Sequence, residues 1–194
     1  MGRFMITRPY LVFIHRDALF AVEASVTGEI VHLPELAPIE EAPAHIAKNA
    51  EPGGFPEKGT AYFPPEGTHI TFDTAGRFVA SPEPPLNGRR PSVDVTFKSV
   101  ARHYGPASIG VLLAGMGQDG ADGLLDIHKA GGITIAQDEA TSLVFGMPKR
   151  AIERGAARCV LPLDRMAEAL VRLTAGLGER PCEEINNMAR SKES

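Results

Sequence analysis

The feature that most constrains the fold is a regular alternation of apolar strands and amphipathic helices in the second half of the chain. Strands are expected at 109–114, 133–136 and 159–162, and helices at 92–104, 121–130, 148–154 and 164–173. Gly131 and Gly132 follow one helix, and Pro148 stands in the first turn of another, as is usual for helix ends and starts. Such alternation predicts an α/β fold of three layers, a mostly parallel, doubly wound sheet with helices on both faces.

The first half of the chain is less regular. In chain order, we expect a strand at 10–14, a helix at 17–24, a strand at 29–33 and a proline-interrupted helix at 35–47. Three short apolar runs follow at 60–63, 69–72 and 77–80, and turn residues separate them. This region predicts an antiparallel hairpin beside the main sheet.

Composition places the chain among globular proteins with one sizeable core. It has 194 residues, of which 43% are hydrophobic, and a formal net charge of −4, which argues against a nucleic-acid partner. No apolar run approaches the ~20 residues needed to cross a bilayer, so no membrane insertion is expected. Cys159 and Cys182 form no C-x-x-C pair, which indicates neither a zinc site nor a disulfide framework and favours a cytoplasmic location. We expect one domain over 1–175 and a flexible tail over 176–194, where periodicity is lost.

The most specific segment is the glycine-rich turn 115–123, which follows a buried strand and opens a helix. Ligands of open α/β sheets bind at such turns, so Asp119 is a candidate functional residue. Three other interpretations fit parts of the pattern: Asp119 as a helix cap, a dinucleotide loop of the G-x-G-x-x-G type, and a calcium loop. An acidic residue would repel a pyrophosphate, and the spaced acidic ligands of a calcium loop are absent.

Five segments together resemble the chemotaxis methylesterase (CheB) family. They are Gly59-Thr-Ala-Tyr-Phe-Pro-Pro65 with His69, Arg90-Pro-Ser-Val-Asp-Val95, Gly115-Met-Gly-Gln-Asp-Gly-Ala121, Ile135-Ala-Gln-Asp-Glu-Ala140 and Val144-Phe-Gly-Met-Pro148. Their order and spacing agree with the family from about residue 47 to 174.

The resemblance implies a serine hydrolase with a Ser-His-Asp triad that needs neither cofactor nor metal. In such a triad the histidine takes the serine proton, the acid orients the histidine, and backbone amides hold the oxyanion. By resemblance, Asp119 is the triad acid, the backbone of Met116 lies near the oxyanion, and His69 is a structural or rim residue.

Residues 1–46 do not match the family well and are interpreted as divergent or truncated. The family's G-A-S-x-G-G turn, which carries the nucleophile, is absent. The turn after the first expected strand, His15-Arg-Asp-Ala18, has neither serine nor glycine, and Ser25 in Ala24-Ser-Val-Thr-Gly28 is the nearest alternative. His32 is the first choice for the triad histidine, and His15 is the second.

Two functions remain open at this point. The first is hydrolysis of glutamate methyl esters on methyl-accepting chemotaxis receptors, with deamidation of glutamine as an additional activity. The second is a degenerate relative that binds receptors or signalling partners without catalysis. A separate receiver domain is a candidate partner in either case. Because the nucleophile motif is not recognisable, we expect weak or absent turnover.

Overall fold

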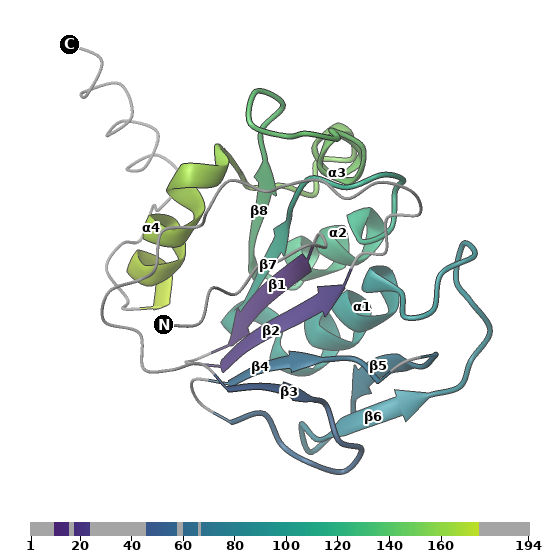
Figure 1. The fold of residues 1–194 in the computed structure, drawn as a ribbon. Helices are drawn as coiled ribbons and strands as arrows, with labels where there is room; N and C mark the ends of the chain where they lie inside the picture. The colour runs from purple at the N-terminus through teal and green to yellow at the C-terminus, as the bar shows by residue number, and fades with distance from the viewer. Residues whose placement is uncertain (1–9, 16–17, 24–45, 58–59, 66, 175–194) are drawn as a thin grey trace, which may run out of the picture.

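A computed structural model describes residues 10–15, 18–23, 46–57, 60–65 and 67–174 (Figure 1). Its main sheet has seven strands in the order β3-β4-β2-β1-β7-β8-β9. Their bounds are β1 Tyr10–His15, β2 Ala18–Glu23, β3 Ile46–Asn49, β4 Thr60–Phe63, β7 Ser108–Leu112, β8 Ile133–Gln137 and β9 Cys159–Leu161. The helices are α1 Val93–Tyr104, α2 Ala121–Lys129, α3 Met147–Glu153 and α4 Leu163–Thr174, with a short 3-10 helix at Gly105–Ala107.

All strands of this sheet except β1 run in the same direction. β3, β4 and β2 pair in parallel, and so do β7, β8 and β9. β1 lies between these two groups and is antiparallel to both of its neighbours. The pairing of Ile109 with Ile133 confirms the prediction that the first two strands of the second half are parallel neighbours. The carboxyl ends of six strands therefore share one edge of the sheet.

Helices cover both faces of the sheet, which confirms the three-layer prediction (Figure 1). Side chains alternate along β7, as the two-residue period of a strand requires. Ile109 and Val111 join the apolar core under α4, whereas Leu112 joins the core under α1, α2 and α3. Gly110 has no side chain because a Cβ there would lie 2.6 Å from Leu124 Cδ1 of α2. α2 therefore packs directly on the strand that precedes the glycine-rich turn.

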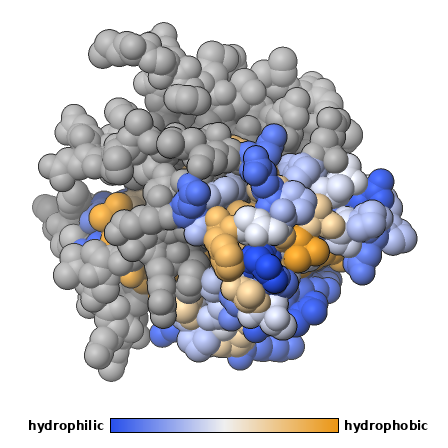
Figure 2. Space-filling model, turned by 90° about the horizontal axis from the view of Figure 1, so that it is seen from below, coloured by the Kyte–Doolittle hydropathy of each residue, from blue (hydrophilic) through white to orange (hydrophobic). Residues whose placement is uncertain are grey.

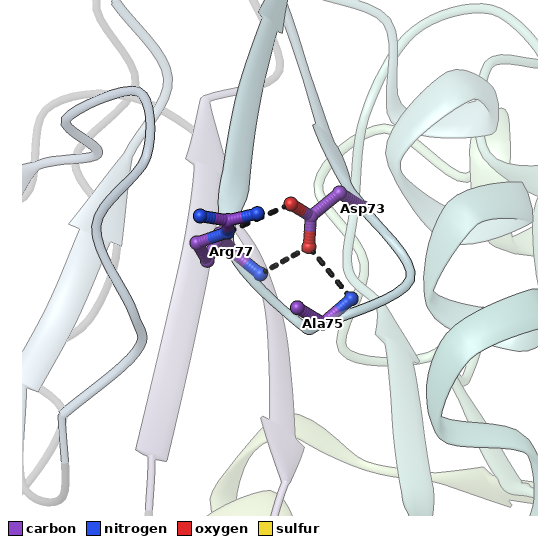
Figure 3. A network of polar contacts seen from close by, with 3 residues as sticks. All are labelled: Asp73, Ala75 and Arg77. Carbon is purple, nitrogen blue, oxygen red and sulfur yellow. Dashed lines mark hydrogen bonds and ion pairs between the residues drawn. The ribbon is translucent and has the colours of Figure 1, made fainter.

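The predicted hairpin is a separate two-stranded antiparallel sheet of β5, His69–Phe72, and β6, Phe78–Ser81. The first of the three runs expected in this region, 60–63, is instead β4 of the main sheet, where it pairs with β2 and β3. Its turn is organised by Asp73, whose Oδ1 accepts hydrogen bonds from the backbone N–H groups of Ala75 and Arg77, both at 2.9 Å (Figure 3). Asp73 Oδ2 accepts another from the Arg77 guanidinium. These bonds, the Arg77 N–H first among them, hold the pKa of Asp73 below its usual range. These bonds close the turn between β5 and β6.

The side of the molecule that carries β6 mixes apolar and polar residues. Figure 2 shows small apolar patches there, separated by hydrophilic side chains. Phe55 and Val79 are the exposed large apolar residues of the segment 49–81. None of the described helices is long and apolar enough to cross a membrane.

Three local predictions were wrong. The apolar spacing of 17–24 predicted a helix, but 18–23 form β2, because these residues pair along their whole length with β1. The end of the helix expected at 35–47 is instead the start of β3, which pairs with β4. Cys159 is disulfide-bonded, although the cysteine spacing indicated no disulfide framework. The strand expected at 29–33, the tail 176–194 and Cys182 lie outside the described residues.

Candidate functional site

The glycine-rich turn lies at the carboxyl end of β7, as predicted. Gly117 and Gly120 have φ values of 102° and 90°, in the left-handed region that favours glycine. A Cβ on Gly120 would also lie 2.4 Å from Val93 Cγ1, so the turn presses directly on the start of α1. This close approach explains why Asp119, between the two glycines, meets α1.

The backbone of Gly115 is tied to the segment before α3. Its N–H donates to Val144 O at 3.0 Å, and its carbonyl oxygen accepts from Met147 N–H at 2.9 Å. Because a trans peptide points its C=O and N–H in opposite directions, Met116 N–H faces away from Met147. No described residue accepts a hydrogen bond from this N–H. Met116 therefore offers one backbone donor that the described part of the chain leaves available.

Arg89 approaches the same turn from the loop before α1. Its Nη2 lies 3.4 Å from the carbonyl oxygen of Met116 and donates to it. The Met116 side chain is 53% exposed and forms part of the rim at this edge of the sheet. Both peptide units that flank Met116 are therefore held in place. Met147 N–H binds the carbonyl oxygen of Gly115 before it, and Arg89 binds the carbonyl oxygen of Met116 itself.

Asp119 is buried and caps α1, not the helix that its own turn opens. Its side chain is 5% exposed. Oδ1 accepts from Ser92 Oγ at 2.8 Å and from Asp94 N–H at 3.1 Å, and Oδ2 accepts from Val93 N–H at 2.9 Å. The contacts agree with the interpretation of Asp119 as a helix cap, but the helix that it caps is α1. One lone pair of Oδ2 has no donor among the described residues.

Asp94 performs the reciprocal task for α2. From the first turn of α1, its Oδ1 accepts from Gly123 N–H at 2.7 Å. Burial raises the pKa of Asp94, and the nearby charge of Asp119 raises it further. Two carboxylates thus cap each other's helices, at positions where the helix dipole favours negative charge. Within the described ranges, no cluster of three or more His, Cys, Asp or Glu side chains is arranged to hold a metal ion.

His69 supports the same junction from β5. It is fully buried, its Nδ1 accepts from Ser92 N–H at 3.1 Å, and its Nε2 lies 3.2 Å from Pro84 O. Nδ1 can accept only when it carries no proton, so Nε2 is the ring nitrogen that donates to the carbonyl. His69 is therefore a structural residue of the junction. No described histidine side chain bonds to Asp119.

The register of β1 separates His15 from Asp119. His15 pairs with Ser108, at the amino end of β7, whereas the Asp119 turn follows the carboxyl end. Four residues of strand separate these two ends, about 13 Å. His15 thus lies at the wrong edge for a triad with Asp119. β2 ends at Glu23 on the correct edge, and Ser25 and His32 follow it outside the described residues.

Sequence reasoning found Asp119 but missed its partners Asp94 and Ser92. Ser92 stands at the N-cap of α1, but its hydroxyl makes no bond to its own helix and donates to Asp119, 27 positions away. Two signals could have identified Asp94: it stands in the first turn of a helix, and its neighbours are otherwise apolar. Both features are typical of a capping carboxylate.

The glycine-rich turn, with its buried acid and its available N–H, lies at the carboxyl edge of the sheet, which is where α/β domains of this class generally bind ligands. The family model described as CheB methylesterase matches residues 35–170, and the chain belongs to this family.

Named relatives agree with this assignment. A protein-glutamate methylesterase/protein-glutamine glutaminase 1 of Anaeromyxobacter dehalogenans is 55% identical over 115 residues, which are 58% of this chain and 33% of that protein. Its namesake from Xanthomonas euvesicatoria is 38% identical over 193 residues, 85% of this chain and 54% of that protein. The chain thus spans a third to about half of the length of these relatives.

A solved structure is also similar. The crystal structure of the Thermotoga maritima CheB methylesterase catalytic domain superposes with a TM-score of 0.62 at 38% identity, over 64% of this chain and 68% of that one.

Proposed function

We propose that this domain hydrolyses methyl esters of glutamate side chains on chemotaxis receptors, and that the same site deamidates glutamine. The observation that carries the proposal is the pairing, in one turn, of a buried carboxylate at Asp119 with an available backbone donor at Met116. Acyl transfer needs both groups, an acid to orient the base and a donor for the oxyanion. The names of the curated relatives supply the substrate class.

In the proposed reaction, Ser25 Oγ attacks the ester carbonyl while His32 takes the serine proton. The tetrahedral oxyanion accepts from Met116 N–H. Its collapse releases methanol, which leaves with the proton from His32, and an acyl-enzyme remains. Water then attacks with the same assistance and releases the glutamate carboxylate.

The direction of the strands supports Ser25 over the turn after β1. β2 is parallel to β4 and antiparallel to β1, so it ends at Glu23 on the same edge of the sheet as the Asp119 turn. The chain therefore enters the segment with Ser25 at the required edge. The turn between β1 and β2 follows His15, at the opposite edge.

Asp119 suits the role of orienting acid because its carboxylate is fixed. Three donors from the start of α1 hold both oxygens, and the remaining lone pair of Oδ2 is sufficient for one imidazole N–H. As partners we propose methyl-accepting chemotaxis receptors and a separate receiver domain, in the cytoplasm.

The test is methanol release from a methylated receptor fragment. Because the nucleophile turn departs from the family pattern, we expect slow release, and Ser25→Ala should abolish it. Ser81→Ala, at the end of β6, is the matched control and should leave the rate unchanged. Release that survives Ser25→Ala would show that another nucleophile acts. A folded parent chain that releases no methanol would refute the proposed function.

Two histidine variants, one at each candidate position, test which histidine is the base. His32→Gln should reduce release about as strongly as Ser25→Ala, since the base and the nucleophile act as a unit. His15→Gln should leave the rate within about twofold, because His15 lies at the opposite edge of the sheet. The reverse result would exclude His32 as the base.

A further inference from the structure

The end of β7 is fixed by a buried side chain from β8. Gln137 is 1% exposed, and its Oε1 accepts from Ala114 N–H at 2.8 Å. Its Nε2 donates to the carbonyl oxygen and the hydroxyl of Thr141, at 2.8 and 3.3 Å. One amide group thus ties the last residue before the glycine-rich turn to the loop that follows β8.

The same loop ends at a second contact with the turn, at Gly146. A Cβ there would lie 2.6 Å from Gly115 O and 3.1 Å from Gly117 N. Gly146 has a φ of −102°, which any residue can adopt, so only the lack of space favours glycine. The two positions that Gly146 touches are the immediate neighbours of Met116.

We propose that Gln137 and Gly146 are positioning residues for Met116 N–H, the oxyanion donor of the proposed function on which this inference rests. Gln137 acts on residue 114, and Gly146 acts on residues 115 and 117, so together they bracket Met116. A donor stabilises an oxyanion only at the right distance and direction, and supporting residues must hold it within a few tenths of an ångström, up to about 0.5 Å.

Simple core packing does not account for these two residues. Gln137 is buried, but its amide group acts through three hydrogen bonds, and Gly146 has no side chain that could pack. Gln137 and Gly146 join the loop after β8 to the glycine-rich turn, and both segments are exposed: Leu143 on the loop is 61% exposed and Met116 in the turn is 53% exposed. The contacts therefore fix one backbone segment against another at the rim and contribute little apolar burial.

The decisive variant is Gly146→Ala, with Ala140→Ser as the matched control. Ala140 is exposed on the same loop. The first measurement is the backbone N–H residual dipolar couplings, which report bond direction. In Gly146→Ala, the couplings of Met116 and Gly117 should change, while those of Val111 and Leu112 in β7 stay as in the parent. The second measurement is steady-state hydrolysis, where kcat should fall about 10- to 100-fold with KM within about twofold.

Unchanged couplings at Met116 would overturn the inference, whether or not the chain is active. Changed couplings in a parent chain that releases no methanol would support the inference and refute the proposed function. If Gly146→Ala does not fold, Gln137→Met tests the same idea, since it removes the bond to Ala114 without adding bulk. It should change the couplings of Gly115 and Met116 and lower kcat in the same way, and unchanged values would again overturn the inference.

Discussion

The two halves of the glycine-rich turn are held by opposite neighbours and by different chemistry. The first half, 115–117, is fixed at its backbone by the segment 137–147 and by the Arg89 guanidinium, beside the exposed side chain of Met116. The second half, 118–123, exchanges carboxylate caps with α1 in a buried junction. The first half thus presents a backbone donor, and the second half presents a carboxylate.

The difference predicts that damage to the two halves has different consequences. The buried junction satisfies several polar groups that have no access to water, so breaking it should cost stability. The contacts of the first half bury little apolar surface, so breaking them should mainly change the geometry of the backbone around Met116. The predictions below test the stability of the second half, from the largest effect to the smallest.

Asp119→Ala should lower the free energy of unfolding by about 3 kcal/mol. It leaves the Ser92 hydroxyl and two N–H groups of α1 without their acceptor in a buried place. The measurement is urea unfolding. Asp122→Ala is the control: Asp122 stands in the first turn of α2 but is half exposed and pairs with Arg154, so it should cost less than about 1 kcal/mol. Equal losses in the two variants would contradict the buried junction.

Gly123→Ala should lower the free energy of unfolding by about 2 kcal/mol, although alanine is the better helix former. A Cβ at this position would lie 2.5 Å from Phe97 Cβ and 3.0 Å from Asp94 O, so α2 must move away from α1. Thermal unfolding measures the loss. A gain in stability would show that the two helices do not meet as closely as the contacts require.

Ser92→Ala should cost about 1 kcal/mol, the usual value for one hydrogen bond. The hydroxyl donates to Asp119, but the N–H donors of Val93 and Asp94 still hold the carboxylate. Urea unfolding of Ser92→Ala, Asp119→Ala and the double variant gives the coupling between them. The free energy of unfolding of the double variant should lie at most about 0.5 kcal/mol below that of Asp119→Ala. Additive losses would mean that the two side chains act independently.

Asp94→Asn should change how stability depends on pH. Because the pKa of Asp94 is raised in the folded state, its favourable contribution is complete below its unfolded value of 3.8 and is lost as pH rises through the folded value. The asparagine Oδ1 still accepts from Gly123 N–H and carries no charge. The variant should therefore gain stability relative to the parent from about pH 4 to pH 7. A difference that stays constant across this range would contradict the prediction.

Much of the second half of the fold follows from the sequence, because each element carries a strong local signal. The strands and helices from 92 to 174 agree with the predicted alternation within one or two residues at most ends. The turn at Asp119 was found for the same reason. Its acceptor role toward α1 could not be predicted, because Ser92 and Asp94 lie 27 and 25 positions away and meet Asp119 only after α1 and α2 have packed.

The N-terminal strands show the opposite case. Residues 18–23, Ala-Leu-Phe-Ala-Val-Glu, have an apolar spacing that fits a helix as well as a strand, and only pairing with β1 decides between them. The direction of β1 was equally hidden, since a buried apolar run has no polarity of its own. For this reason the sequence did not show that His15 lies at the edge of the sheet opposite to the Asp119 turn.

The pairing of β1 determines how the two parts of the carboxyl edge are positioned relative to each other. It joins two blocks of parallel strands, β3-β4-β2 and β7-β8-β9, and it is the strand through which they pair (Figure 1). Asp119 follows a strand of one block, and the segment with Ser25 follows a strand of the other. A change of one residue in the pairing of β1 with β7 would slide one block past the other by about 3.3 Å. The pairing of Phe13 with Gly110 on one side and with Phe20 on the other therefore sets the relative position of the two segments that carry the proposed site residues Asp119 and Ser25.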